Sequence, residues 1–196
     1  DYGTVENIVA ERKGLDSTIW KDEVLAQLYE QSIVALWDSI RLKKNKFEQI
    51  EKFSFDKIKI PKFSKNVLID KGITKMLYNN EKDSLDFNGW LKLINNWKGG
   101  IKISHVEFHQ KEFHPGNENS SLYNFTFHVQ SSSTKYIING ICNVEWSNSQ
   151  NSYGNYLANE LDLKTFDVLI YSGDDSFELS QIIGTDGDKS FTGPGM

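Results

Sequence analysis

The period of the hydrophobic pattern changes near Gly100, which predicts helices before that residue and strands after it. From Trp20 onward, apolar residues recur at steps of three and four, the spacing of one face of an amphipathic helix. The residues of this face are Leu25, Leu28, Tyr29, Ile33, Leu36, Trp37 and Ile40. Ser17 is the expected N-cap. Three later apolar positions extend the stripe, either in the same helix or in a second one: Phe47, Ile50 and Phe53.

The segment between this helix and residue 83 is less regular. Residues 53–60 alternate imperfectly and precede Pro61, which cannot donate a ladder hydrogen bond. This stretch is therefore predicted to be an edge strand or an extended connection. A short helix is expected over residues 73–78, where the pattern is weak.

A second clear helix follows Asp86. This residue is expected to cap a helix that carries Trp90 and Trp97, and the pair Gly99-Gly100 is expected to end it. The same apolar spacing of three and four predicts that one side of this helix packs against the rest of the fold.

Beyond Gly100, apolar and polar residues alternate, which predicts long strands. Four strands are expected at residues 101–113, 122–130, 136–146 and 161–171, and residues 177–183 could pair back as a hairpin. Short polar turns imply an antiparallel meander, and the preceding helices must cover one of its faces. The predicted fold class is α+β, with N-terminal helices packed on a strongly curved antiparallel sheet. Gly140 is an expected bend.

The chain of 196 residues is long enough for one sizeable core. Residues 1–16 lack a clear period and are expected to be a lead-in segment, and residues 17–183 to form a single domain. Residues 184–196 are expected to be a linker towards a following repeat domain, as part of a longer protein.

Charge and hydropathy narrow the possible partners. The formal net charge is −5 with no dominant basic face, so nucleic acid is not an expected partner. No apolar run approaches the roughly 20 residues that a membrane-spanning helix needs. The chain itself leaves its compartment open.

The residues that could carry catalysis are scattered. Cys142 is the only cysteine, so no intrachain disulfide is possible, and it is expected to be a small buried residue. His105 and His109 share a strand face about 13 Å apart, too far to hold one metal. No zinc motif, nucleophile elbow or phosphate loop is present, so neither a metal nor a cofactor is expected.

A curved sheet tends to leave a hollow between itself and its helices, where a small ligand can sit. The aromatic and titratable residues expected near this hollow are Trp37, Trp90, Tyr123, His128, Trp146 and Asp167. Catalysis would need at least two titratable groups that converge on one cavity. Asp167 and Glu145 are more simply explained as exposed strand charges, so no catalytic residue is assigned.

The order of a helix, a connecting segment, a shorter helix and long strands covers residues 17–171. It resembles the cone-shaped, cystatin-like fold of the nuclear transport factor two and ketosteroid isomerase superfamily, which includes SnoaL-like domains. That superfamily holds isomerases, dehydratases and assembly domains, so the resemblance implies a fold and not an activity. Its isomerase pattern of a pocket Tyr plus two Asp has no residue-by-residue counterpart here.

Three segments are also similar to the N-terminal region of bacterial exported proteins that carry FG-GAP repeats and an ASPIC/UnbV module. They are residues 101–108 (IKISHVEF), 136–146 (YIINGICNVEW) and 161–168 (LDLKTFDV). This resemblance implies an accessory domain of an exported, periplasmic or extracellular protein.

The resulting hypothesis is a non-catalytic accessory domain for dimerisation, inter-domain docking or small-ligand binding in a larger exported protein. Its expected partners are a second copy, the C-terminal repeat domain of the same protein, or a small apolar ligand. The alternative is a small-molecule isomerase or lyase with Asp167, Tyr123 or His128 in a pocket between sheet and helices.

Overall fold

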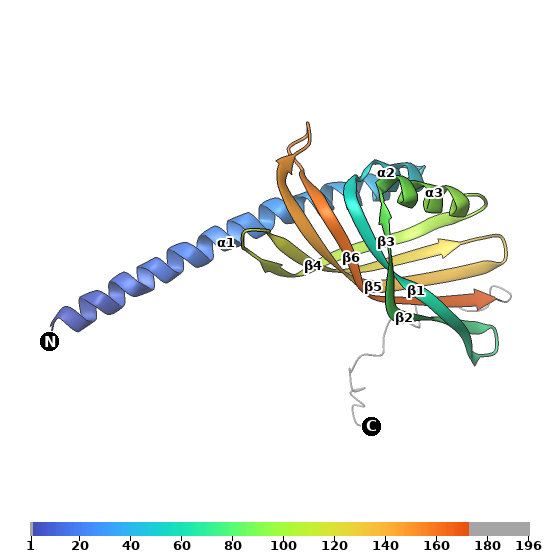
Figure 1. Cartoon of the computed structure of the whole chain (residues 1–196), viewed down its shortest axis with the longest axis horizontal. Helices are drawn as coiled ribbons and strands as arrows, with labels where there is room; N and C mark the ends of the chain where they lie inside the picture. Colours follow the sequence, from blue (N-terminus) through green and yellow to red (C-terminus); the bar gives the residue numbers. More distant parts are fainter. Residues whose placement is uncertain (1, 173–196) are drawn as a thin grey trace, which may run out of the picture.

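Three helices lie against one face of a strongly curved six-stranded sheet (Figure 1). The computed structural model describes residues 2–172. The helices are α1 (Tyr2–Leu42), α2 (Lys46–Lys52) and α3 (Phe87–Trp97). The strands are β1 (Phe55–Asp70), β2 (Ile73–Asp86), β3 (Lys102–His114), β4 (Ser120–Gln130), β5 (Thr134–Gln150) and β6 (Tyr156–Ser172). The predicted α+β fold class is confirmed.

The sheet has the order β1-β2-β6-β5-β4-β3. Strands β3 to β6 form the predicted antiparallel meander, with each strand hydrogen-bonded to the next. β2 continues the sheet beside β6, and the first residues of β1 also pair with β6 in parallel, from Phe55 against Ala158 to Lys59 against Asp162. The sheet thereby joins two strands, β1 and β6, that are about 100 residues apart in the sequence.

The curvature of the sheet has local causes. Register shifts interrupt the β1–β2 pairing after Pro61 and the β5–β6 pairing after Ile141, and such bulges bend a strand. Gly140 is the expected bend, because a Cβ built there would lie 2.4 Å from Thr165 O and 2.5 Å from the ring of Phe125. Only a glycine at this position of β5 leaves room for the backbone of β6 and for the ring of Phe125 from β4.

Two predictions about the first half of the chain are wrong. Ser17 is not an N-cap, because α1 already begins at Tyr2 and Ser17 lies inside it. The residues before it, such as Ala10, Glu11 and Arg12, are good helix formers that extend the helix upstream. The short helix expected over residues 73–78 is instead part of β2, where pairing with two neighbouring strands overrides a weak local pattern.

The edge strand or extended connection expected over residues 53–60 is a strand, β1, but Lys57 to Lys59 pair with both β2 and β6 and so do not lie at an edge. The strand does not stop at Pro61. It continues as β1 to Asp70, because a proline is tolerated at a bulge of an edge strand. Residues 2–16, the expected lead-in, form the first part of α1. The division into lead-in, domain and linker stays a prediction, and residues 177–183 and 184–196 lie outside the described part of the chain.

Aromatic side chains hold α1 against the sheet. The ring of Tyr29 lies 4.1 Å from that of Tyr156 and 5.4 Å from that of Trp146, measured between centroids. Trp146 is buried, and its Nε1 donates a hydrogen bond of 2.8 Å to Ser121 Oγ. The N-terminal part of α1 runs out beyond the sheet (Figure 1). None of the helices within residues 2–172 is long and apolar enough to cross a membrane.

Candidate functional site

A cavity of about 470 Å³ lies between the concave face of the sheet and the three helices. All three helices and all six strands contribute to its wall. Every side chain that lines it belongs to Ile, Leu, Val, Met, Phe, Tyr, Trp or Cys, and none carries a formal charge. Its volume falls within the range of about 300–1,000 Å³ that is typical of small-molecule pockets.

Helix α3 forms one wall of the cavity. Its N-cap Asp86 accepts a 2.7 Å hydrogen bond from Gly89 N, as the sequence predicts. From there the helical spacing turns Trp90, Ile94 and Trp97 towards the interior. Trp97 also keeps 43% of its surface exposed, so it lies at the rim.

The end of α3 is tied to α2 beside this rim. Lys98 Nζ lies 2.8 Å from Glu51 Oε1 of α2. The chain then turns at Gly100, whose φ of +83° lies in the left-handed region that favours glycine. The predicted helix and its glycine end are therefore confirmed.

The polar groups on the cavity wall are few and uncharged. Tyr123 Oη donates a hydrogen bond of 2.7 Å to Gln110 Oε1, and burial raises the pKa of this phenol. Burial also raises the pKa of Tyr78 to about 12 and that of the Cys142 thiol to about 12. Because all three groups keep their protons at neutral pH, none can act there as a base or as a thiolate nucleophile.

Trp90 carries the other notable polar group of the wall. Its Nε1 is buried and has no hydrogen-bond partner among the residues that the structure describes. A buried donor without a partner costs about 1–3 kcal/mol. Such groups are rare in natural proteins and tend to mark sites that serve something other than stability.

Of the six residues expected near the hollow, Trp90 and Tyr123 line the cavity. Trp37 lies outside it, at a small surface pocket of about 200 Å³ between α1 and β3, and its Nε1 donates a 2.7 Å hydrogen bond to Val106 O. Trp146 belongs to the neighbouring buried cluster around Tyr29.

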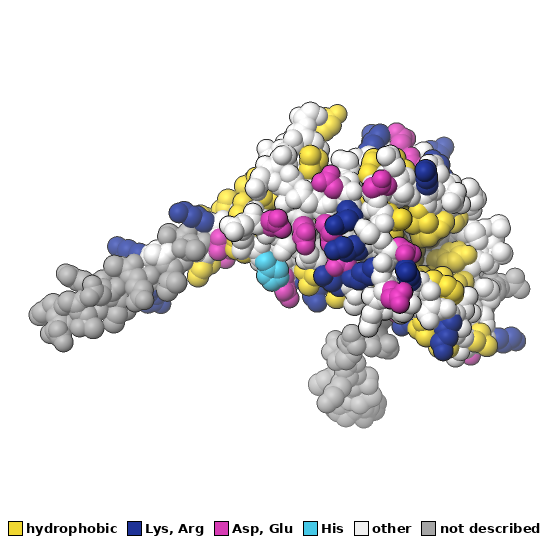
Figure 2. All heavy atoms as spheres, in the orientation of Figure 1, with side chains coloured by type: hydrophobic (Ala, Val, Ile, Leu, Met, Phe, Trp, Pro, Cys, Tyr) yellow, Lys and Arg dark blue, Asp and Glu magenta, His cyan; other side chains and the backbone are white. Residues whose placement is uncertain are grey.

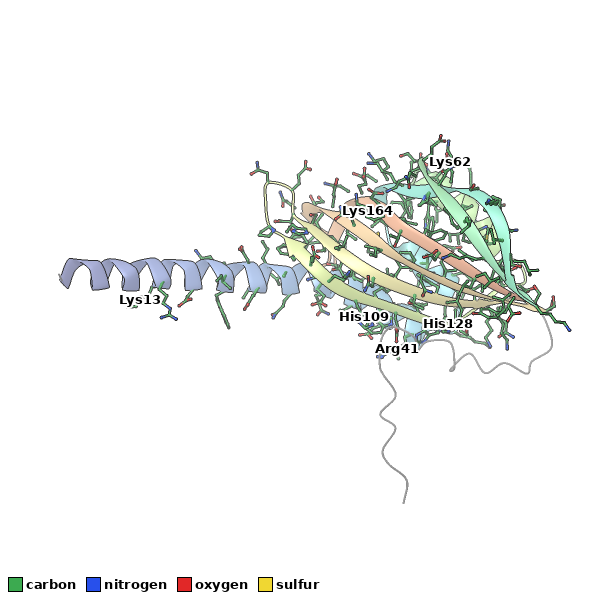
Figure 3. All side chains as sticks on the ribbon, turned by 90° about the horizontal axis from the view of Figure 1, so that it is seen from below. Lys13, Arg41, Lys62, His109, His128 and Lys164 are labelled. Atoms are coloured by element: carbon green, nitrogen blue, oxygen red, sulfur yellow. The ribbon has the colours of Figure 1, made fainter. Side chains whose placement is uncertain are left out.

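His128 and Asp167 lie on the opposite face of the sheet. His128 is labelled in Figure 3. Its ring is next to that of His105, with centroids 4.9 Å apart, and burial lowers the pKa of His128. The carboxylate of Asp167 lies 2.7 Å from Lys75 Nζ and is about half exposed. Neither residue can reach the cavity, so the two do not form an acid–base pair with Tyr123.

The convex face also carries a compact cluster of charges on β1, β2 and β6 (Figure 2). Lys57 and Lys59 lie 2.7 Å and 2.5 Å from the carboxylate oxygens of Glu160. Asp162 is held in the same way by Lys82 and by Lys164, the latter at 2.6 Å. Both carboxylates are almost fully covered by these lysines.

The ammonium groups determine how the two acids titrate. Burial alone would raise the pKa of Glu160, but the hydrogen bonds from Lys57 and Lys59 outweigh it and hold this pKa below its ordinary value of 4.5. The pKa of Asp162 is lowered for the same reason, with its two lysines outweighing burial. Because Glu160 is paired with lysines of β1 and Asp162 with Lys82 of β2, the cluster fixes the place of β1 and β2 beside β6.

Comparison with known proteins identifies neither a family nor an activity for this chain. No protein-family model and no curated protein matches the chain. Among solved structures, it is similar to a crystal structure of a hexachlorocyclohexane dehydrochlorinase (LinA) Type2. The TM-score is 0.42 and the sequence identity 9%, over 74% of this chain and 89% of that one. A similarity at this level supports no inference about activity.

Sequence reasoning missed one part of the site. Met76 and Tyr78 line the cavity from β2, in the stretch that was expected to be helical. The available signal was composition: Ile73 and Thr74 are β-branched and Tyr78 is aromatic, which favours a strand.

Proposed function

We propose that this chain is a non-catalytic domain that binds a small, uncharged, mostly apolar molecule in its interior cavity. The observation that carries the proposal is the cavity of about 470 Å³ with an entirely uncharged wall. Protein interiors are normally close-packed. An apolar wall that no protein side chain covers is left in contact with water, and covering it with an apolar molecule is favourable by roughly 25 cal/mol per Å².

The volume of the cavity limits the size of the ligand, and its uncharged wall limits the charge that the ligand can carry. An engineered cavity of about 150 Å³ holds one benzene, so a cavity about three times larger fits a molecule of about 18 non-hydrogen atoms. A carboxylate or an ammonium group would be buried there without a partner, at a high cost in free energy. A neutral hydrocarbon-like molecule meets both limits.

The alternative, an isomerase or lyase, has less support. It needs at least two titratable groups that converge on one space. The titratable groups on the described wall are tyrosines and Cys142, and burial keeps Tyr78, Tyr123 and Cys142 protonated at neutral pH. The two other residues of this hypothesis, His128 and Asp167, lie on the convex face.

The wider setting is part of the same proposal. The similarity of three segments to exported FG-GAP proteins supports an accessory domain that precedes repeats in a bacterial exported protein, built on the nuclear transport factor two-like cone. In such a protein, the domain would also dimerise or dock onto a neighbouring domain. A mass measurement in dilute solution that returned only monomer would count against dimerisation.

The experiment that tests ligand binding uses the uncharged dye N-phenyl-1-naphthylamine, which is within the size limit of the cavity and whose fluorescence rises in apolar surroundings. We expect the wild-type chain to bind it in a saturable way. Ile138→Trp should abolish binding, because residue 138 points into the cavity and indole would fill part of it. Ile141→Trp is the matched control, since residue 141 lies on the same strand but faces the other side of the sheet.

Both variants must first be shown to fold, by circular dichroism and by a cooperative urea transition. Saturable binding that survives Ile138→Trp, or binding that is lost equally in Ile141→Trp, would place the dye outside the cavity and contradict the proposal. No binding at all to the wild-type chain would contradict it too.

A further inference from the structure

The end of the β1–β2 hairpin exposes several apolar side chains. Val67, Leu68 and Ile69 follow one another on β1, and 36%, 71% and 56% of their surfaces are exposed. Phe63, earlier on the same strand, is 50% exposed. Runs of consecutive exposed apolar residues are unusual on a protein surface and indicate an interaction site.

The arrangement of these residues indicates which kind of surface they can contact. Successive side chains of a strand point to opposite faces, so Leu68 points away from Val67 and Ile69. β1 is at the edge of the sheet, and its exposed end is followed by the turn at Gly72. Apolar side chains therefore lie on both faces of this end. A flat protein partner would cover one face, whereas a lipid layer surrounds an inserted tip on all sides.

The charges around the tip favour an anionic surface. Residues 62–78 contain Lys62, Lys65, Lys71 and Lys75 but only one acid, Asp70, although the whole chain has a net charge of −5. Lys62 lies 3.4 Å from Glu81 Oε2, and Lys75 is paired with Asp167. Within residues 2–172, no ion pair holds the ammonium groups of Lys65 and Lys71. Figure 2 shows dark-blue and yellow side chains together at this end of the molecule.

We propose that this hairpin end docks on the surface of a membrane that contains anionic lipids. Val67, Leu68 and Ile69 enter the boundary between headgroups and acyl chains, while Lys65 and Lys71 remain at the level of the lipid phosphates. The contact is peripheral and reversible, because three aliphatic side chains anchor a protein far less firmly than a spanning helix. It does not depend on the occupancy of the interior cavity.

The test is co-sedimentation of the full chain with lipid vesicles. We expect binding to vesicles of equal parts phosphatidylcholine and phosphatidylglycerol, and at least tenfold weaker binding to pure phosphatidylcholine. The double variant Leu68→Asn/Ile69→Asn should lower the partition coefficient at least tenfold. Lys65→Gln/Lys71→Gln should lower it by about fivefold per lysine at low salt. Each loss should occur without a change in the urea midpoint, because these residues are exposed.

The matched control is Val24→Asn/Leu28→Asn, which removes two comparably exposed apolar side chains from α1. It should bind vesicles within twofold of the wild type. Leu68→Trp adds a second readout: the difference between its fluorescence and that of the wild type, which has five tryptophans, should shift to shorter wavelength with anionic vesicles only. Equal binding by the Leu68/Ile69 variant and the wild type would overturn the proposal. So would an absence of vesicle binding, including the case in which that variant instead converts a dimer into a monomer.

Discussion

Asn119 Nδ2 donates a hydrogen bond of 2.9 Å to Tyr29 Oη, across 90 residues of chain. Asn119 is 8% exposed and Tyr29 2%, so water does not compete for this bond. The side chain of Asn119 also accepts a hydrogen bond from Gly116 N at 3.1 Å. One buried amide thus ties α1 to the turn that precedes β4.

Replacing Tyr29 by Phe should destabilise the fold while keeping the aromatic packing. The amide of Asn119 would lose its acceptor inside the core, which costs about 1–3 kcal/mol. We expect the free energy of unfolding in urea to fall by this amount. Tyr153→Phe is the control, because Tyr153 is 88% exposed and its change should stay within about 0.5 kcal/mol. Equal effects of the two variants would contradict this account.

Gly140→Ala should also destabilise the protein, by about 1–3 kcal/mol or more. The new methyl group would lie 2.4 Å from Thr165 O, which belongs to the backbone and cannot rotate away. Gly99→Ala is the control, since no atom lies within 4 Å of a Cβ at that position. Thermal unfolding should separate the two variants, and a Gly140→Ala protein as stable as the wild type would show that the strands can move apart.

The charge cluster predicts how stability depends on pH. The pKa values of Glu160 and Asp162 are lower in the folded chain than their ordinary values of 4.5 and 3.8. Their ion pairs therefore contribute fully above about pH 4.5, and the contribution is lost as the pH falls through the lowered pKa values. Glu160→Gln should make the loss of stability between pH 4.5 and pH 2 less steep.

The control for this titration is Glu118→Gln, an exposed glutamate in the turn before β4. It removes a carboxylate that lies outside the charge cluster, so a change common to both variants is not due to the cluster. Urea midpoints measured at several pH values would check both variants. A Glu160→Gln protein with the slope of the wild type would mean that the cluster does not couple to folding.

The thiol of Cys142 should react slowly in the folded protein. Burial raises its pKa to about 12, so almost no thiolate is present at pH 8. Ellman's reagent should label it at least a hundredfold more slowly in buffer than in denaturing urea. Because Cys142 lines the cavity, saturating N-phenyl-1-naphthylamine should slow the labelling further. Rapid labelling of the native chain at pH 8 would contradict the burial of this side chain.

The strands after Gly100 could be predicted because alternation of apolar and polar residues is a strong local signal. α3 could be predicted because its N-cap, its apolar stripe and the glycine pair at its end all indicate the same helix. The placement of His128 and Asp167 also had a signal. His128 is five residues from Tyr123, and an odd offset along a strand puts two side chains on opposite faces. Asp167 lies between Phe166 and Val168, which both line the cavity.

The cavity itself could not be predicted. Several strands carry apolar residues on both faces, and Ile137, on the convex side, is as buried as many residues of the core. Which face meets the helices depends on the bulges and on the pairing of β1 with β6, two strands about 100 residues apart in sequence. Such long-range pairings leave little trace in a local pattern.

The position of β6 affects how this protein can be made. β6 pairs with β1, β2 and β5, and it is the last described strand to leave the ribosome. Until β6 has emerged, the β1–β2 hairpin lacks the strand that joins it to the rest of the sheet. At about 5–20 residues per second, this delay lasts several seconds. The complete sheet can therefore form only after β6 has been synthesised.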